Sequence, residues 1–480
     1  MSESLYGSQF QVKAIITNQE QLQAQFQAMS KLSRQTPILT WTQRLSHLEA
    51  LEQMLKECQS QFAQAISQDF NHRSVDETNF AELFPSFQAI AYAKKHGQSW
   101  MKTRRVGISA LYLPAHNEIH PQPLGVVGII VPWNYPLYLA VAPMIDALTA
   151  GNRIMIKMSE TAPNFAQCFA EAVASYFSAD VVSVVLGEVE VAKAFSELPF
   201  DHLLYTGSTE VGKKVMAAAA PNLTPVTLEL GGKSPVVVLD DADIETVVNR
   251  VMMGKTLNAG QTCIAPDYVL LPRQYHQQFI TLAKQWMQKH YPNLAHNEDY
   301  THLISDEQFN RVQGYLEALD TDKVYPLTEV DAHSKSRLFP PVIVTEPALD
   351  STLMQEEIFA PILPLIHYDS ISEVVHFINQ RPRPLALYLF GSDEDNLRYV
   401  MDYTVSGGVA VNEVILHVAQ HELPFGGVGD SGIGAYHGQT GFERFSHMKP
   451  VFVQSRLNAM NLLLPPYGKL FKKGIDWLIK

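Results

Sequence analysis

Apolar residues in the first hundred positions of the chain recur at the spacing of a helix. In residues 45–67, LSHLEALEQMLKECQSQFAQAIS, they return every three or four positions, and residues 80–102 show the same period. Such a period places the apolar side chains on one face of an α-helix. The first hundred residues are therefore predicted to be mainly helical.

The pattern changes after residue 124. Short apolar runs rich in β-branched residues now alternate with stretches of helical period, and turn residues separate them. Such runs are typical of strands that are buried on both faces of a parallel sheet. The predicted strands are GVVGIIV (125–131), RIMIK (153–157), VVSVVL (181–186) and HLLYT (202–206). Strands that alternate with helices predict an α/β fold with a doubly wound, mostly parallel sheet.

A second alternating region begins at SPVVVLDDAD (234–243) and continues to about residue 414, which predicts a second α/β domain. Residues 101–123 alternate between polar and apolar side chains. We expect them to form a pair of strands that extends out of the body of the protein.

Composition narrows the class of protein. The chain has 480 residues, too many for one hydrophobic core, and a net charge of −13, which disfavours a general role in nucleic-acid binding. Its three cysteines, Cys58, Cys168 and Cys263, are too few for a disulfide framework and indicate a reducing compartment. Residues 1–21 lack a basic segment followed by an apolar core, so we expect no secretory signal and a cytoplasmic location.

Residues 121–145 carry no charge and are long enough to span a bilayer. They also contain five prolines, which would free backbone groups that lipid cannot satisfy. We therefore predict a buried strand, turn and helix rather than a membrane span.

The three cysteines lie in different settings. Cys58 and Cys168 fall within predicted helices and are expected to be packing residues, whereas Cys263 lies in LNAGQTCIAPDYV (257–269), a polar stretch typical of a loop. A thiol in a loop is a candidate nucleophile. Glu229 stands between leucines just before two glycines, where desolvation would suit it to accept a proton. Asn134 is held between two prolines in PWNYP as a candidate oxyanion donor, although an Asn that only stabilises a turn is the commoner case.

The stretch LLYTGSTEVGKK combines a predicted strand, a glycine-bearing turn and the start of a helix. Gly207 and Gly212 are five residues apart, which fits neither of the common phosphate-binding motifs, yet the free N–H groups of a helix start can hold a phosphate. Lys157 and Glu160 follow the strand RIMIK. They could bind ribose hydroxyls, or they could be the solvated end of a strand.

Six short sequence strings, taken together, connect these candidate residues. PWNYP, GSTEVG, LELGGKSP, GQTC, EEIFAPI and PFGGVGDSGIGAYHG occur in this order between about residues 120 and 450. The chain thereby resembles the aldehyde dehydrogenase superfamily. The longer strings NAGQTCIAPDYVL and GIGAYHG are similar to its class 3 branch, and residues 79–101 and 131–160 are similar to the bacterial coniferyl aldehyde dehydrogenases of that branch.

The resemblance implies a role for each matching residue. Cys263 matches the nucleophile, Glu229 the general base and Asn134 the oxyanion donor. The residues matched to cofactor binding are Trp133, Lys157, Ser159, Glu160, Gly207, Ser208, Thr209, Val211, Gly212, Leu230, Glu357 and Phe359. Aromatic residues expected to line the substrate tunnel are Tyr135, Tyr138 and Phe425. Met158 departs from the family pattern, which often has proline there, and leaves both NAD and NADP open as cofactor.

The same resemblance implies a reaction and an architecture. The reaction is the NAD(P)-dependent oxidation of an aldehyde to its acid through a thiohemiacetal and a thioester, with no metal site. Coniferyl-type aldehydes are the expected substrates, and medium- or long-chain aliphatic aldehydes are the alternative. A cysteine hydrolase or acyltransferase is the alternative from a different class. The implied parts are an NAD(P)-binding domain (1–101 and 124–228), a catalytic domain (229–414), an oligomerisation arm (102–123 and 436–456) that forms a homodimer, and a C-terminal tail (457–480).

In the tail, lysines alternate with large apolar residues after two prolines. This basic amphipathic pattern fits a segment that packs across a partner subunit or one that lies on a membrane surface, and we expect packing because the segment is short and contains Gly474.

Overall fold

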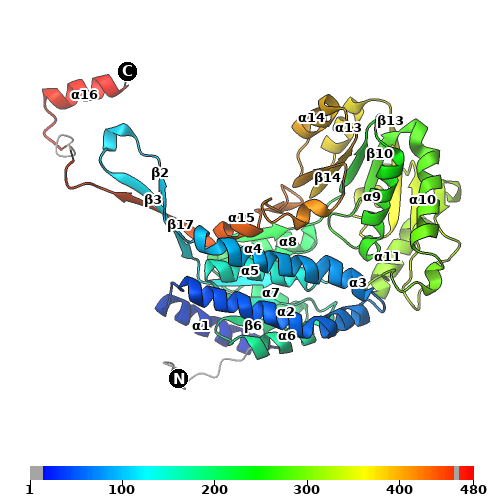
Figure 1. The fold of residues 1–480 in the computed structure, drawn as a ribbon, viewed down its shortest axis with the longest axis horizontal. Coiled ribbons are helices and arrows are strands. Elements are labelled where there is room, and N and C mark those ends of the chain that lie inside the picture. The colour runs from blue at the N-terminus through cyan, green and yellow to red at the C-terminus, as the bar shows by residue number, and fades with distance from the viewer. Residues whose placement is uncertain (1–14, 459–463, 480) are drawn as a thin grey trace.

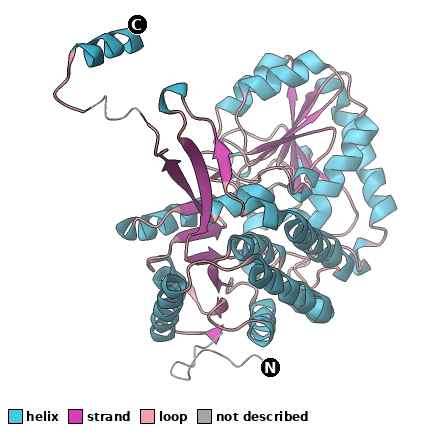
Figure 2. Cartoon of the chain, turned by 60° about the vertical axis from the view of Figure 1, so that its left-hand side comes forward, coloured by secondary structure: helices cyan, strands magenta, loops and turns pink. Residues whose placement is uncertain are grey.

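The computed structural model describes residues 15–458 and 464–479, and Lys480, the last lysine of the tail, lies outside them. Two α/β bodies lie side by side, and an arm projects from the first of them (Figure 1). Each body is built on its own seven-stranded sheet, and the arm carries a third sheet of three strands (Figure 2).

The first sheet has the strand order β1-β6-β5-β4-β7-β8-β16. Its strands are β1 (Ile15–Ile16), β4 (Val126–Ile130), β5 (Arg153–Lys157), β6 (Val182–Val185), β7 (His202–Thr206), β8 (Val226–Glu229) and β16 (Gly432–Ile433). All neighbours pair in parallel except β16, which is antiparallel to β8. The four strands predicted in this region and their alternation with helices are confirmed.

Helices cover both faces of the first sheet. They are α1 (Gln19–Gln35), α2 (Trp41–Asp69), α3 (Val75–Thr78), α4 (Phe84–Trp100), α5 (Tyr138–Ala150), α6 (Pro163–Tyr176), α7 (Val189–Ser196), α8 (Thr209–Ala219) and α15 (Gly438–Arg444), with a π-helical turn at Asn79–Leu83. Gly151 ends α5 in a left-handed conformation (φ 91°), as expected for a glycine that follows a helix. The N-terminal residues are mainly helical, as the apolar period predicted.

The second sheet follows the order β11-β12-β13-β10-β9-β14-β15, and only β11 is antiparallel to its neighbour. Its strands are β9 (Pro235–Val238), β10 (Tyr268–Pro272), β11 (Val324–Pro326), β12 (Val342–Thr345), β13 (Ile362–Tyr368), β14 (Ala386–Phe390) and β15 (Gly408–Val411). Its helices are α9 (Ile244–Thr256), α10 (His276–His290), α11 (Asp306–Glu317), α12 (Thr352–Gln355), α13 (Ile371–Asn379) and α14 (Glu394–Tyr403). The second α/β region predicted from the sequence is therefore confirmed.

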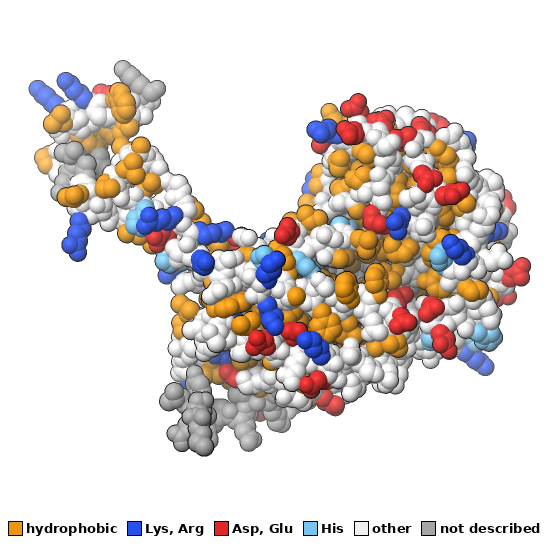
Figure 3. Space-filling model, viewed as in Figure 1, with side chains coloured by type: hydrophobic (Ala, Val, Ile, Leu, Met, Phe, Trp, Pro, Cys, Tyr) orange, Lys and Arg blue, Asp and Glu red, His pale blue; other side chains and the backbone are white. Residues whose placement is uncertain are grey.

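The arm is a three-stranded antiparallel sheet in the order β17-β3-β2. The strands β2 (Arg104–Val106) and β3 (His116–Pro123) form the predicted pair, and β17 (Ser446–Val453) joins them from near the end of the chain. Beyond the arm lies α16 (Lys469–Ile479), which has no buried residue. Figure 3 shows hydrophobic side chains on both the arm and α16, with Lys side chains at the far end.

Residues 121–145 form the end of β3, then β4, a turn and most of α5. Every residue of β4 and α5 is buried within the first body. The prediction of a buried strand, turn and helix is confirmed. No helix in the described ranges combines the length and the apolar character that a membrane span needs.

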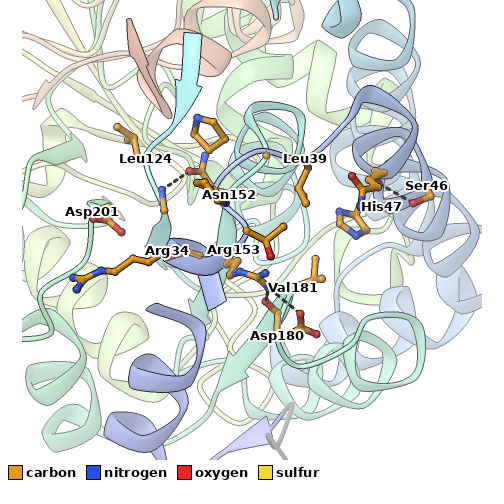
Figure 4. Close-up of a pocket in the computed structure, with 17 residues that line it drawn as sticks. Arg34, Leu39, Ser46, His47, Leu124, Asn152, Arg153, Asp180, Val181 and Asp201 are labelled. Carbon is orange, nitrogen blue, oxygen red and sulfur yellow. Dashed lines mark hydrogen bonds and ion pairs between the residues drawn. The ribbon is translucent and has the colours of Figure 1, made fainter. Parts of the chain in front are cut away.

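A cavity of about 350 Å³ opens at the amino ends of β4, β5, β6 and β7 (Figure 4). Asn152 closes one side of it, where its Oδ1 accepts a hydrogen bond of 2.9 Å from the N–H of Gly125. Arg153 bonds Asp180 on another side, with 2.8 Å between Nη1 and Oδ2. Ligands of doubly wound sheets bind at the opposite, carboxyl ends of the strands, and all candidate site residues lie away from this cavity.

Candidate active site

The loop that carries Cys263 follows α9 in a strained conformation. Asn258, Ala259 and Gly260 have positive φ angles of 53°, 51° and 73°. The left-handed region is costly for a residue with a Cβ, so both Asn258 and Ala259 need support from their surroundings. At position 260 a Cβ would lie 2.6 Å from the carbonyl oxygen of Ala360, so only glycine fits.

Gln261 supports this loop from within. Its side-chain Nε2 donates hydrogen bonds to the carbonyl oxygens of Asn258 (2.9 Å) and His302 (3.1 Å), and its Oε1 accepts one from the N–H of Ile304 (2.9 Å). Gln261 is buried, so these bonds are protected from water. The loop is thereby fixed two residues before Cys263.

Asn134 lies against the same loop. Its side-chain Nδ2 donates a hydrogen bond of 3.2 Å to the carbonyl oxygen of Gln261, and its own carbonyl oxygen accepts one of 3.0 Å from Nδ2 of Asn258. The next residue, Tyr135, shares a hydrogen bond of 2.7 Å with the hydroxyl of Thr262. The PWNYP turn and the loop that carries Cys263 (257–263), more than 120 residues apart in sequence, are thus joined by three hydrogen bonds.

Glu229 ends β8 and pairs in the sheet with Gly432 of β16. Its side chain is 2 % exposed, and neither carboxylate oxygen has a hydrogen-bond partner. Burial raises the pKa of Glu229 well above its usual value, although Arg444 opposes this shift. Burial also raises the pKa of the Cys263 thiol, and the charges of Glu357 and Glu229 add to that shift. The thiol is therefore protonated at neutral pH and needs a proton acceptor before it can react.

An apolar cavity of about 170 Å³ leads to Cys263 from one side. Tyr135, Tyr138 and Phe425, the three aromatic residues predicted to line a substrate tunnel, all contribute to its wall. The other lining residues are Phe80, Ala81, Phe84, Pro85, Leu139, Leu257, Thr262, Cys263, Ile264, Ile415, Leu416, Val418, Ala419 and Tyr436. A cavity of this composition fits the apolar part of a small molecule.

A more polar cavity of about 250 Å³ reaches Cys263 from the other side. It contains nine of the predicted site residues together with six others, and its wall is formed by Pro132, Trp133, Asn134, Leu139, Thr206, Gly207, Ser208, Glu229, Leu230, Gly231, Cys263, Gln308, Arg311, Glu357 and Phe359. The rings of Trp133 and Phe359 meet edge to face at 5.3 Å. Cys263 thus lies where the two cavities meet.

Glu357 is aimed into the polar cavity. Its carboxylate accepts a hydrogen bond from the N–H of Gly232, and a Cβ at Gly231 would lie 1.9 Å from its Oε2. The other oxygen, Oε1, is buried without a partner. Burial raises the pKa of Glu357 to about 8. A buried oxygen without a partner is costly, so this atom fits a ligand that donates a hydrogen bond, such as a ribose hydroxyl.

The remaining cofactor candidates lie at the carboxyl end of β5 and in the first turn of α8. Lys157 is 1 % exposed, so the alternative of a solvated strand end is wrong for it. Its ammonium donates to the carbonyl oxygen of Met158 (2.6 Å) and to Oε2 of Glu160 (3.2 Å), whose side chain is 35 % exposed. Ser159 accepts a hydrogen bond from the N–H of Thr161 and lies beside them.

At the start of α8 the Ser208 hydroxyl accepts a hydrogen bond from the N–H of Val211, and the hydroxyl of Thr209 donates to Asp430. Gly212 is packed closely, because a Cβ there would lie 2.6 Å from Cδ2 of Leu230. The start of this helix, with Gly207 and Ser208, forms part of the wall of the polar cavity.

These residues fit a dinucleotide. The helix start at Ser208 suits a phosphate, the partner-free oxygen of Glu357 suits a ribose hydroxyl, and the aromatic pair of Trp133 and Phe359 suits a flat ring. The exposed carboxylate of Glu160 suits a second ribose.

Several residues of this site were not predicted. Tyr436, Gln308, Arg311, Asn258 and Gln261 line the cavities or fix the nucleophile loop. Asn258 and Gln261 stand within the NAGQ string, where two amides next to a glycine were an available signal. Tyr436 stands within the GIGAYHG string, whereas Gln308 and Arg311 come from a segment that offers no local pattern.

Comparison with known proteins agrees with this geometry. Residues 9–451 match the model of the aldehyde dehydrogenase family. The chain belongs to this family, and it is an NAD(P)-dependent aldehyde dehydrogenase.

Within the family, relatives of several kinds are similar over nearly the full length. A probable coniferyl aldehyde dehydrogenase of Pseudomonas aeruginosa is 48 % identical over 94 % of this chain and 95 % of its own length. Coniferyl aldehyde dehydrogenase of a Pseudomonas species is 41 % identical over 94 % of each chain, and aldehyde dehydrogenase family 3 member A2 of Pongo abelii is 39 % identical over 90 % of this chain and 88 % of its own. The solved structure titled as the substrate-bound state of Staphylococcus aureus AldH has a TM-score of 0.90 and 35 % identity, and covers 96 % of this chain and 99 % of that one. The resemblance to the class 3 branch found in the sequence is confirmed.

Proposed function

We propose that this enzyme oxidises coniferyl-type aromatic aldehydes, with Cys263 as nucleophile, Glu229 as general base and Asn134 as oxyanion donor. The observation that carries this proposal is the position of Cys263 between an apolar cavity and a polar one. An aldehyde would enter from the apolar side, and the residues of the polar side would hold the nicotinamide ring.

The carbonyl carbon of an aldehyde must become tetrahedral and electron-rich before it can release a hydride. In the proposed reaction the Cys263 thiol gives its proton to water, which carries it to solvent, and its sulfur adds to this carbon to form a thiohemiacetal. The amide of Asn134 and a backbone N–H at Cys263 hold the resulting oxyanion. Bound NAD(P)⁺ supplies the acceptor for the hydride that leaves the adduct.

A thioester on Cys263 then remains. Glu229 accepts a proton from water, the water oxygen attacks the thioester carbon, and the acid leaves as the thiol is restored. The balance is one aldehyde, one NAD(P)⁺ and one water consumed for one acid, one NAD(P)H and one proton. The buried, partner-free carboxylate of Glu229 and its raised pKa support this role.

The aromatic wall of the apolar cavity supports an aromatic substrate, as do the names of the Pseudomonas relatives. Medium- and long-chain aliphatic aldehydes are the alternative. The test is the growth of absorbance at 340 nm with purified protein, NAD and either coniferaldehyde or octanal. A kcat/KM for coniferaldehyde at least tenfold above that for octanal is expected, and the reverse order would refute the substrate proposal. No NADH with any aldehyde would favour a cysteine hydrolase instead.

We propose NAD as the preferred cofactor. The Glu160 carboxylate suits a free ribose 2′-hydroxyl and repels a 2′-phosphate. The pairing of Glu160 with Lys157 partly offsets that repulsion, which leaves NADP usable. A canine relative, 39 % identical, carries the name dimeric NADP-preferring aldehyde dehydrogenase, so the cofactor ratio has to be measured on this chain.

The proposed domains follow the sheets. The first sheet and its helices bind the dinucleotide, and the second body carries the nucleophile in the loop between α9 and β10. Within residues 436–456, α15 packs on α4 and α5 of the first body, so β17 is the part that joins the arm.

We further propose that the chain forms a homodimer through the arm. Leu111, Leu113 and Phe452 are 59 %, 60 % and 52 % exposed there, an unusual apolar surface for a monomer. Light scattering after gel filtration tests this proposal: the wild type should have twice the mass of the chain, and a Leu111→Asp, Phe452→Asp variant should have the mass of one chain.

For the tail we propose packing on the partner subunit. The apolar residues Leu470 and Trp477 of α16 are 84 % and 77 % exposed within one chain, and such a face is covered in a folded assembly. Removal of residues 457–480 should therefore weaken the dimer. Sedimentation of the intact protein, but not of the truncated one, with anionic lipid vesicles would contradict this proposal and favour a membrane surface.

A further inference from the structure

A cluster of three buried charged residues lies directly behind the two turns of the active site. We infer that Arg73, Glu77 and Glu82 form a positioning unit that holds the Asn134 turn and the Cys263 loop in register. This inference rests on the roles proposed above for Asn134 and Cys263. Hydrogen bonds connect the cluster to each of the two turns.

The cluster itself is compact and shielded from water. Nη1 of Arg73 is 2.9 Å from Oε1 of Glu82, and Nε of Arg73 is 3.4 Å from Oε1 of Glu77. The side chains of Arg73 and Glu82 are 0 % exposed and that of Glu77 is 8 % exposed. The Arg73 guanidinium also lies over the Tyr135 ring, 4.9 Å from its centroid. Charges this deeply buried are costly unless each is well paired.

The first connection runs to the Asn134 turn. Nη1 of Arg73 donates a hydrogen bond of 3.0 Å to the carbonyl oxygen of Asn134. Oε2 of Glu82 accepts hydrogen bonds from the N–H groups of Leu137 (2.8 Å) and Tyr138 (3.0 Å), the first turn of α5. The cluster therefore holds the PWNYP turn at its middle residue and at the helix start that follows it.

The second connection runs to the nucleophile loop. Oε1 of Glu77 accepts a hydrogen bond of 3.0 Å from the N–H of Asn258, the first left-handed residue of that loop, and one of 3.1 Å from the hydroxyl of Thr301. Nδ2 of Asn258 in turn donates to the carbonyl oxygens of Asn134 (3.0 Å) and Gln261 (3.1 Å). Strain at Asn258 is thus offset by contacts that begin at Glu77.

The geometry makes Arg73 the shared element. Its guanidinium binds both carboxylates and the Asn134 carbonyl oxygen from one rigid plane. A lysine has a single charged nitrogen and cannot reproduce this arrangement. If the cluster positions the site, Arg73 variants will lower kcat and the reactivity of the Cys263 thiol, while binding of the cofactor stays intact. If the cluster serves only stability, the variants will change the melting temperature. In the folded fraction they will then leave kcat and the reactivity of the Cys263 thiol unchanged.

A matched control is available in Arg44. It is 3 % exposed, and its guanidinium donates to the carbonyl oxygens of Leu39 (3.1 Å), Thr149 (2.9 Å) and Ala150 (2.7 Å), away from both active-site turns. Arg44 is buried to a similar extent as Arg73 but does not contact the active site. Arg44→Lys therefore measures the general effect of losing a buried guanidinium.

The experiment compares Arg73→Lys, Glu77→Gln and Arg44→Lys in a chain that also carries Cys58→Ala and Cys168→Ala. The readouts are kcat, KM for aldehyde, Kd for NAD and the rate of Cys263 alkylation by iodoacetamide. We expect Arg73→Lys to lower kcat and the alkylation rate at least tenfold, with both KM and Kd within threefold of the parent. Glu77→Gln keeps the shape and the acceptor oxygen, so it will fold and will lower both rates by threefold to tenfold. Arg44→Lys will leave the rates of the folded protein within twofold.

Rates within twofold of the parent in folded Arg73→Lys and Glu77→Gln would overturn the inference, as would an equal loss in Arg44→Lys. Alkylation of Cys263 by iodoacetamide does not depend on aldehyde oxidation. Its rate therefore tests the positioning role of the cluster even if the proposed function is wrong. Turnover that survives Cys263→Ala would refute the proposed role of the cysteine, whatever the Arg73 variants do.

Discussion

The side-chain amide of Asn134 donates a hydrogen bond of 3.2 Å to the backbone carbonyl oxygen of Gln261, two residues before Cys263. One of its two N–H groups is thus used to hold the nucleophile loop, and the other is left to meet an oxyanion. The proposed oxyanion donor and the proposed nucleophile are therefore parts of one rigid unit.

Replacement of Asn134 by alanine removes the proposed oxyanion donor. The loss of one such donor typically costs about 2.7–4 kcal/mol of transition-state stabilisation, so kcat should fall about a hundredfold or more. Steady-state kinetics measure this, with cofactor binding as the control for folding. A kcat within threefold of the wild type would contradict the assignment.

Replacement of Cys263 by alanine should abolish turnover, because no other thiol lines either cavity. Binding of NAD should persist, as shown by fluorescence titration. The control is Cys168→Ala, a partly buried thiol on α6, which should keep its activity. Mass spectrometry of wild type trapped with aldehyde and NAD should find the acyl group on residue 263, and an adduct elsewhere would refute this role.

Replacement of Glu229 by glutamine keeps the shape of the side chain but removes its capacity to accept a proton. The reaction should then stop after hydride transfer, with a burst of about one NADH per active site and slow formation of acid. Stopped-flow absorbance at 340 nm and acid analysis measure the two steps. Full steady-state turnover in this variant would show that another group activates water.

Replacement of Glu160 by glutamine tests the choice of cofactor. Removing the carboxylate reduces the repulsion of a 2′-phosphate, so the ratio of kcat/KM for NAD to that for NADP should fall at least fivefold. Glu190→Gln, an exposed carboxylate on α7, is the control and should leave the ratio unchanged. A ratio that rises in Glu160→Gln would refute the proposed contact.

The buried carboxyl of Glu357 predicts a pH dependence of stability. Burial raises its pKa from 4.5 to about 8, so between these values the folded state holds a proton that the unfolded state has released. Stability from this group is therefore present below pH 4.5 and is lost as the pH rises towards 8. In Glu357→Gln the fall in melting temperature between pH 5 and pH 8 should be smaller than in wild type. Glu356→Gln, an exposed neighbour, should retain the full fall.

The sequence predicted the two α/β bodies because buried parallel strands and their helices leave a strong local pattern. GVVGIIV and RIMIK became β4 and β5, as predicted. It could not predict that β1 and β16 join the first sheet, since each has only two residues and too little pattern to be recognised.

The buried charges of the site also escaped prediction. The sequence shows Arg73 and Glu82 as ordinary polar residues near helix starts, and only long-range packing places them behind Asn134. Burial of Lys157 was missed for the same reason. The strings PWNYP, GSTEVG and LELGG lie at the carboxyl ends of β4, β7 and β8, whereas GQTC and EEIF precede β10 and β13. Residues of all five strings meet around the two cavities.

The pairing of β16 with β8 affects how the protein can be made. Glu229 is covered by a strand that the ribosome delivers only after it has translated some two hundred further residues, including all of the second sheet. The nascent chain thus carries an unfinished sheet edge while these residues are made, and such edges promote aggregation. Premature termination between Glu229 and Gly432 would release a polypeptide with this edge open and its proposed base exposed to water.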